Sequence, residues 1–346
     1  MKKAILLIPL LFGILTFGQT PVDDPHWELV WEDHFNNINP NIWLVQNNFD
    51  HYGLEVQVYT DRLNNVFVSN DTLVIRVRNE TYSCPAGSLN TWGCVKQYET
   101  GQPYNYTSGW IETKQAYNIQ YGYIEARVKL PYGYGFWPAF WTSIGNGVSG
   151  PSNVAEIDIF EMLGGGADSL SLYNTSSIMT TNYHLVYPSY NLLKAHIPIS
   201  FDYTQWHTYA IEWSPSKIIW YLDGYPIRLI PNPGIVDPIK IILNFAIRPD
   251  YLPNQTSPFP SDMLIDFVKV YKLRNDCNTV LNACNYNFGM HDNKVKRSIT
   301  IGNNSCVNSL GVGQSVFLRA SEGVLINGDF TVPIGAELYI DVNACY

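Results

Sequence analysis

The sequence predicts an all-β protein built as a β-sandwich. Between Trp27 and Tyr271, short segments of alternating β-branched or aromatic residues end at Gly, Pro, Asn or Asp turns. No long stretch keeps a helical period. Many short strands separated by such turns are typical of two packed sheets. Aromatic residues make up 14% of the 346 residues, and a sandwich core together with a ligand cleft would account for them.

The N-terminal segment is typical of an export signal. Lys2 and Lys3 precede an apolar run from Ala4 to Phe17, which is too short for a stable membrane span. A membrane anchor is the alternative, and a lipid attachment is not expected because no Cys follows the run. We expect residues 1–19 to be a signal peptide. The protein would then be secreted, extracellular or periplasmic, and without a membrane span.

The alternating segments continue along the chain with the same character. Those that read most clearly as strands are Asn65–Ser69, Leu73–Arg78, Tyr123–Lys129 and Lys217–Leu222. Length permits one large core and a small appendage. The formal net charge of −9 excludes nucleic acid as an expected partner and disfavours anionic partners in general. We expect a monomer.

Six cysteines suit an oxidising destination. Cys84 and Cys94 flank a loop and predict a local disulfide. The other four allow three pairings, which the sequence does not decide; they are Cys277, Cys284, Cys306 and Cys345. A zinc site is the alternative, but no His/Cys cluster has the expected short paired spacing.

The segment Ala155–Met162 places three acids in an apolar strand. Strand side chains alternate, so Glu156 and Asp158 share one face. Glu161 joins that face only if a β-bulge inserts one residue. Crowded carboxylates push their pKa values apart, as glycoside hydrolysis requires: one ionised nucleophile and one protonated acid. A solvated strand face with incidental acids is the alternative.

Beyond Lys272 the composition changes, and residues 273–346 predict a small β-rich appendage held by disulfides. Its expected strands are Ser298–Ile301, Val316–Arg319, Gly323–Ile326 and Glu337–Asp341. A spacer, a surface-association element and a weak glycan-binding module all remain open as its role. It loosely resembles short C-terminal extensions of secreted proteins from Bacteroidetes-type bacteria.

Six blocks of the chain, in order, closely resemble glycoside hydrolase family 16, the group of laminarinases, lichenases, agarases and carrageenases. The blocks are Gly122–Pro131, Gly135–Trp141, Ala155–Met162, Gln205–Trp213, Trp220–Gly224 and Leu264–Tyr271. The resemblance covers roughly residues 26–272 and implies a jelly-roll sandwich, with residues 22–272 as the catalytic domain. The acidic strand is similar to the bulged Glu-x-Asp-x-x-Glu form of the laminarinase and β-glucanase type.

The resemblance implies catalytic roles for the three acids. Glu156 would be the nucleophile, Glu161 the general acid and then base, and Asp158 the group that hydrogen-bonds Glu156 between them. No cofactor would be needed for catalysis, and retention of anomeric configuration would follow. A non-catalytic lectin on the same fold is the alternative, although a binding module has no need for all three acids.

Further residues are candidates for contact with the polysaccharide. Trp137 and Trp141 share a strand face and would form a stacking platform, with Trp141 favoured because it is nearer the acidic strand. The resemblance implies cleft positions for Glu55, Asn244 and His207; Arg127 and Arg248 are added as possible substrate contacts. Packed core positions are the alternative for the two Trp residues and for His207.

The resemblance also implies a structural calcium ion on the sheet opposite the cleft. Asp266 would supply a carboxylate, and backbone carbonyls near Glu32 and Asp71 would complete the oxygen ligands. An exposed Asp capping a turn is the alternative.

The predicted substrate is β-1,3-glucan or mixed β-1,3-1,4-glucan. The segment Tyr52–Tyr59 is similar to one common in β-glucan-cleaving members. A marine galactan (agar, porphyran or carrageenan) is the alternative substrate, because the chain departs from the laminarinase pattern in two places. These are Gly150–Ala155, before the acids, and Ile247–Tyr251, after the Asn244 segment.

Overall fold

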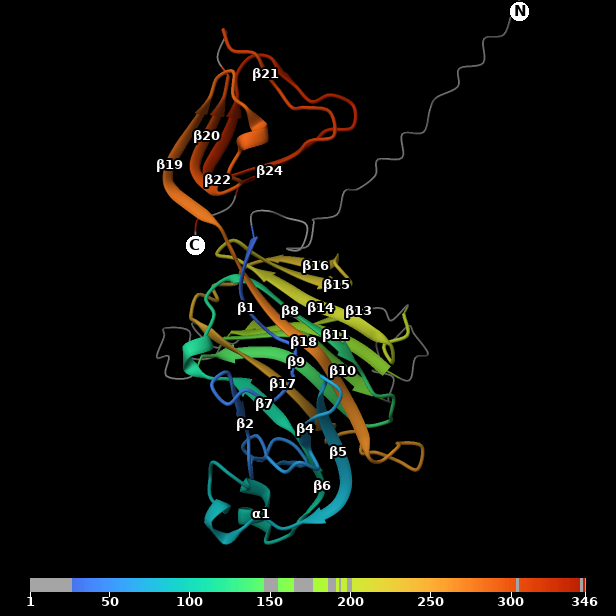
Figure 1. The fold of residues 1–346 in the computed structure, drawn as a ribbon. Coiled ribbons are helices and arrows are strands. Elements are labelled where there is room, and N and C mark those ends of the chain that lie inside the picture. Colours follow the sequence, from blue (N-terminus) through green and yellow to red (C-terminus); the bar gives the residue numbers. More distant parts are fainter. Residues whose placement is uncertain are drawn as a thin grey trace, which may run out of the picture.

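The computed structural model describes residues 27–145, 155–164, 177–185, 191–192, 194–197, 201–302, 305–342 and 345. It shows two large sheets packed as a sandwich and a smaller C-terminal sheet at one end (Figure 1). The predicted all-β fold is therefore confirmed. The predicted signal peptide lies outside the described residues. Among the described residues, none of the helices combines the length and apolar character of a membrane span.

The first sheet of the sandwich, here called the outer sheet, has ten strands in the described residues. Its central strands pair antiparallel in the order β14, β8, β18, β5. Its members are β1 (Trp27–Asp33), β3 (Val58–Tyr59), β4 (Val66–Val68), β5 (Leu73–Tyr82), β6 (Tyr104–Ser108), β8 (Gly122–Lys129), β14 (Trp206–Trp213), β15 (Lys217–Leu222), β16 (Tyr225–Pro231) and β18 (Ser261–Leu273).

The second sheet, here called the cleft sheet, has eight strands in the described residues. The acidic segment forms its strand β10, between β9 and β11. Its members are β2 (Trp43–Val45), β7 (Trp110–Thr113), β9 (Phe136–Ile144), β10 (Ala155–Gly164), β11 (Ser177–Leu185), β12 (Asn191–Leu192), β13 (Ala195–Ile197) and β17 (Ile239–Ile247).

Alternation within the strands builds the core between the two sheets. Ile124 and Ile211 of the outer sheet and Ile157 and Leu243 of the cleft sheet belong to one fully buried apolar cluster. The acids of β10 alternate with these apolar side chains, so they lie on the other face of the cleft sheet. Core packing on one face therefore fixes the backbone that carries the acids on the other.

Helices are short in the described residues and lie in the loops. They are α1 (Val95–Thr100) and the 3₁₀ turns Ala86–Ser88, Gln115–Tyr117 and Phe288–Met290. The predicted Cys84–Cys94 disulfide closes the loop that contains the 3₁₀ turn Ala86–Ser88, and Cys94 caps the N-terminus of α1.

The C-terminal segment forms a four-stranded parallel sheet with a short two-stranded pair. The strands of the sheet are β19 (Asn275–Ala283), β20 (Val295–Ile301), β22 (Ser315–Ile326) and β24 (Glu337–Val342), and the pair is β21 (Asn308–Ser309) with β23 (Phe330–Thr331). The disulfides are Cys277–Cys345 and Cys284–Cys306, which decides among the three pairings that the sequence allowed. A small apolar cluster of its own, including Ile301 and Leu318, lies inside.

Candidate active site

A β-bulge in β10 brings the three acids to one face. Against β11, Asp158 pairs with Asn182 and Glu161 pairs with Thr180. Between these two pairs β10 advances by three residues and β11 by two, so β10 contains one extra residue. The register with β9 shifts in the same interval, between Asp158 and Phe160. The bulge predicted from parity is confirmed.

A tryptophan of the outer sheet holds the bulge from behind. The indole nitrogen of Trp220, on β15, donates a hydrogen bond to the backbone carbonyl of Asp158 at 2.8 Å. Trp220 is fully buried, and the guanidinium of Arg228 lies 4.6 Å from its ring. Because a bulge breaks the ladder, a carbonyl inside it needs such a partner.

Glu161 is held by two donors on neighbouring strands. Trp137 Nε1, on β9, donates to Oε1 at 3.0 Å, and the Thr180 hydroxyl, on β11, donates to Oε2 at 2.9 Å. Burial, and then the charge of Asp158, raises the pKa of Glu161 to about 7, although these hydrogen bonds and Lys194 oppose the shift. A carboxyl group with this pKa stays protonated in mildly acidic solution, as a general acid requires.

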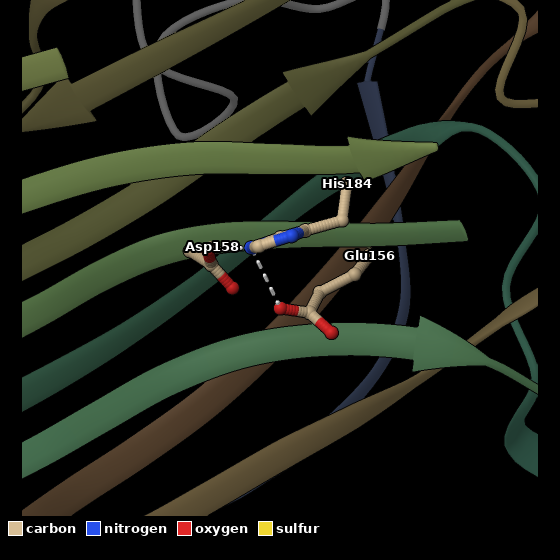
Figure 2. A group of neighbouring side chains, drawn as sticks. All are labelled: Glu156, Asp158 and His184. Atoms are coloured by element: carbon tan, nitrogen blue, oxygen red, sulfur yellow. Dashed lines mark ion pairs between the residues drawn. The ribbon is translucent and has the colours of Figure 1, made fainter. Parts of the chain in front are cut away.

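Glu156 and Asp158 form a compact group with His184 of β11 (Figure 2). His184 Nε2 lies 3.2 Å from Glu156 Oε1 and 3.5 Å from Asp158 Oδ2. Burial raises the pKa of Glu156, followed by the charges of Asp158 and Glu161 and a hydrogen bond with Asp158. Asp158 is only 2% exposed, so its charge acts on both glutamates through a poorly screened interior.

The acids line a cavity of about 380 Å³ on the cleft sheet. Its walls include four of the residues proposed from the sequence for substrate contact: Glu55, Trp137, Trp141 and Asn244. Polar side chains beside the acids and apolar or aromatic side chains around them give the composition of a small-molecule site.

Trp141 and Glu55 belong to one hydrogen-bonded chain. Trp141 Nε1 donates to Asn244 Oδ1 at 2.8 Å, and Asn244 Nδ2 contacts the Tyr59 hydroxyl at 2.8 Å. The Tyr59 hydroxyl in turn donates to Glu55, which also lies 3.0 Å from His51 Nδ1. Trp141 is 8% exposed, so most of its ring is packed. Trp137 is half-buried and offers more of its ring to the cavity.

Two residues proposed for the cleft lie elsewhere. His207 is on β14 of the outer sheet, where it contacts Asp223 at 2.7 Å and the backbone of Asp202, so its placement near the cleft was wrong. Arg127 is on β8 of the outer sheet and pairs with Asp266, so it does not contact the cleft either. The local sequence pattern does not indicate which of the two sheets these strands join.

Arg248 lies just beyond β17, at the edge of the cleft. Its guanidinium lies 4.1 Å from the Tyr251 ring, and the next residue, Pro249, lines the cavity. Arg248 itself is not among the residues of the cavity wall.

The Asp266 carboxylate proposed for calcium forms an ion pair in this structure. The Asp266 carboxylate, at a register shift in β18, already pairs with Arg127 Nη1 at 2.6 Å. A divalent cation bound by this carboxylate would compete with the Arg127 guanidinium for it. Within the described residues, the one group of His, Cys, Asp or Glu side chains close enough to hold a metal is Glu156, Asp158 and His184, the acidic group itself.

Several cavity residues were not predicted from the sequence. They are His51, Leu54, Asn182, His184, Lys194 and Pro249, besides the small Ala139. The signal for part of this set is alternation in β11: Thr180, Asn182 and His184 occupy every second position opposite the acids. Lys194 lies between β12 and β13, and nothing in the local sequence pattern indicates that it lines the cavity.

Comparison with known proteins agrees with this geometry. The family model described as glycosyl hydrolases family 16 matches residues 55–241. The β-glucanase of Rhodothermus marinus is 28% identical over 297 residues, which is 79% of this chain and 95% of that protein. The glucan endo-1,3-β-glucosidase A1 of Niallia circulans is 27% identical over 74% of this chain, which spans only 37% of that longer protein.

A solved structure extends the agreement to three dimensions. The catalytic domain of an endo-1,3-β-glucanase (laminarinase) from Thermotoga petrophila superimposes with a TM-score of 0.56 at 29% identity, over 72% of this chain and 99% of that one. The bulged strand with its three acids, the jelly-roll sandwich and the family match all indicate the same family. This chain belongs to glycoside hydrolase family 16, and it is an endo-acting glycoside hydrolase.

Proposed function

We propose that the protein is a secreted endo-glucanase that cleaves β-1,3 or mixed β-1,3-1,4 bonds with retention of configuration. The observation that carries this proposal is the cluster of Glu156, Asp158 and Glu161 on one face of β10, inside a cavity walled by two indoles. The names of similar proteins, a β-glucanase and endo-1,3-β-glucanases, support a β-glucan as the substrate.

In the first step, Glu156 in its carboxylate form attacks the anomeric carbon and forms a glycosyl-enzyme ester, while protonated Glu161 donates its proton to the departing sugar oxygen. His184 lies beside Glu156, and Asp158 forms a hydrogen bond with it, so both hold the Glu156 carboxyl group in place. The raised pKa of Glu161 keeps its proton available for this transfer.

In the second step, Glu161 is ionised and removes a proton from water, which attacks the ester and releases Glu156. The oxygens of Glu161 keep their orientation through both steps because Trp137 and Thr180 each hold one of them. The two sugar products share the atoms of one water molecule.

Secretion is supported by three disulfides, which persist in oxidising compartments, and by the signal-like N-terminal sequence. The substrate is tested by reducing-end release from laminarin, lichenan, agarose, porphyran and carrageenan. We expect release from laminarin or lichenan. Release from a galactan alone would overturn the glucan proposal, and release from none would overturn the enzyme activity proposed for these polysaccharides.

A further inference from the structure

The C-terminal sheet and the sandwich share one apolar cluster. Trp27 of β1, Tyr271 and Leu273 of β18, and Val295 of β20 all belong to it. Cys345, bonded to Cys277, packs against the same cluster. The C-terminal sheet lies where β18 leads into β19 (Figure 1). A buried apolar contact on top of a short covalent link restrains how the two units move relative to each other.

A cavity of about 320 Å³ lies beside this cluster, with walls from both units. It shares no residue with the catalytic cleft. Strands β14, β15 and β16, with Trp27 of β1, form one wall, and β22 and β24 form the other. Junctions between domains are places where ligand sites occur, and this volume is within the usual range for them. The side chains that matter for recognition are Glu212, Lys217, Tyr221, Phe317, Arg319, Tyr339 and Asp341.

The C-terminal wall carries an aromatic surface. The rings of Phe317 and Tyr339, on adjacent strands, stack with centroids 4.6 Å apart and planes at 10°. Tyr339 is half-buried, and Leu229 on the opposite wall is 61% exposed, so the cavity reaches the protein surface. An accessible aromatic surface suits the C–H face of a pyranose ring, because both are apolar and flat.

The polar groups of the two walls balance in charge. Arg319 Nε lies 2.8 Å from Asp341 Oδ2 on one side. On the other, Lys217 Nζ lies 3.7 Å from Glu212 Oε1, and the Tyr221 hydroxyl donates to Glu212 Oε2 at 3.1 Å. A charged ligand would compete with one member of each pair. A neutral ligand rich in hydroxyls can instead add hydrogen bonds to both, since guanidinium, ammonium and carboxylate groups each make several.

We propose that this junction cavity binds a sugar unit of a polysaccharide, as a second carbohydrate site besides the catalytic cleft. The aromatic surface and the balanced donors and acceptors carry the proposal. The choice of a β-glucan as probe rests on the proposed function. A second site would hold the enzyme on an insoluble glucan while the cleft cleaves a neighbouring chain, and would add affinity through effective concentration.

The number of sites is measured on the full-length protein. The probe is laminarihexaose, titrated calorimetrically into the protein carrying Glu161→Gln, which prevents cleavage. We expect two sites per chain, and one site when Tyr339→Ala is added. If the Glu161→Gln protein bound laminarihexaose at one site, and adding Tyr339→Ala left that binding unaltered, the proposal would be overturned.

Retention on an insoluble β-1,3-glucan is measured on the protein with an intact cleft. Tyr339→Ala and Lys217→Gln, one from each wall, should each lower retention at least tenfold. Tyr225→Ala is the matched control, because Tyr225 is 62% exposed on β16 and outside the cavity wall. The kcat/KM on soluble laminarihexaose should stay unchanged in all three. Thermal melts identify any variant that fails to fold. If one of the two wall variants does not fold, the retention of the variant from the other wall tests the proposal.

Failure of this inference is distinguishable from failure of the proposed function. If β-glucan is hydrolysed but folded Tyr339→Ala and Lys217→Gln proteins are retained as well as Tyr225→Ala, the second site is wrong and the glucanase stands. If a galactan is hydrolysed instead, the same comparison is made with that galactan. Weaker retention of the two wall variants would then support the site, and equal retention would overturn it.

Discussion

The indole nitrogen of Trp137 lies 3.0 Å from Oε1 of Glu161. One ring therefore lines the cleft and also orients the carboxyl group that we assign as general acid. A sugar that stacks on this ring is placed beside the acid by the same side chain, so binding and proton transfer depend on one rotamer.

Glu156→Gln and Glu161→Gln should each lower kcat on the order of a thousandfold or more, because an amide can neither form the ester nor cycle the proton. Asp158→Asn should lose less, since Asp158 only supports Glu156. Reducing-end assays on the purified variants measure this, with thermal melts as the control for folding. A Gln variant that kept more than a tenth of the wild-type turnover would contradict the assignment.

Activity should fall as pH rises through about 7, because the pKa of Glu161 is raised to about 7 and its proton is needed for catalysis. The same shift affects stability. The folded protein binds this proton more tightly than the unfolded chain, so the free energy of unfolding decreases as pH rises from about 4.3 toward 7. Glu161→Gln should remove that part of the decrease. Melts of both proteins across this interval test it, and parallel curves would argue against a raised pKa.

Trp137→Ala and Trp141→Ala should differ. Trp141 is 8% exposed and bonded to Asn244, so its loss should lower the free energy of unfolding by about 3–5 kcal/mol. Trp137 is half-buried, so its loss should weaken oligosaccharide binding more than stability and should also disturb the pH profile of Glu161. The structure thus favours Trp137 over Trp141 as the platform. Melts combined with oligosaccharide titrations separate the two effects, and equal destabilisation with normal binding would rule out a platform.

A chain shortened to end at Lys272 should keep the cleft but lose stability. The truncation removes Leu273 and Val295 from the shared cluster and exposes Trp27 and Tyr271 to water. Activity on soluble oligosaccharides should persist at low temperature, while the midpoint of thermal unfolding falls. An unchanged midpoint would show that the cluster adds nothing to the sandwich.

The sequence predicted the sandwich, the bulge and the acids because each depends on local alternation. Glu156 and Asp158 follow from parity, and Glu161 follows once one extra residue is allowed. Residues whose position depends on strand order could not be predicted in the same way. His207 and Arg127 lie on strands with clear patterns, yet those strands pair in the outer sheet. His184 was missed because it reaches the site from β11, whose pairing with β10 no local pattern indicates.

The bulge in β10 has a consequence for how this active site can vary. All three acids belong to one strand, so their spacing is counted in whole residues and cannot be adjusted by small shifts of a loop. Deleting either Ile159 or Phe160 would leave the three acids at every second position, so a regular strand would carry them on one face without the bulge. Deleting both would turn Glu161 to the opposite face. The face that Glu161 occupies therefore depends on the number of residues between Asp158 and Glu161 and on whether the strand is bulged.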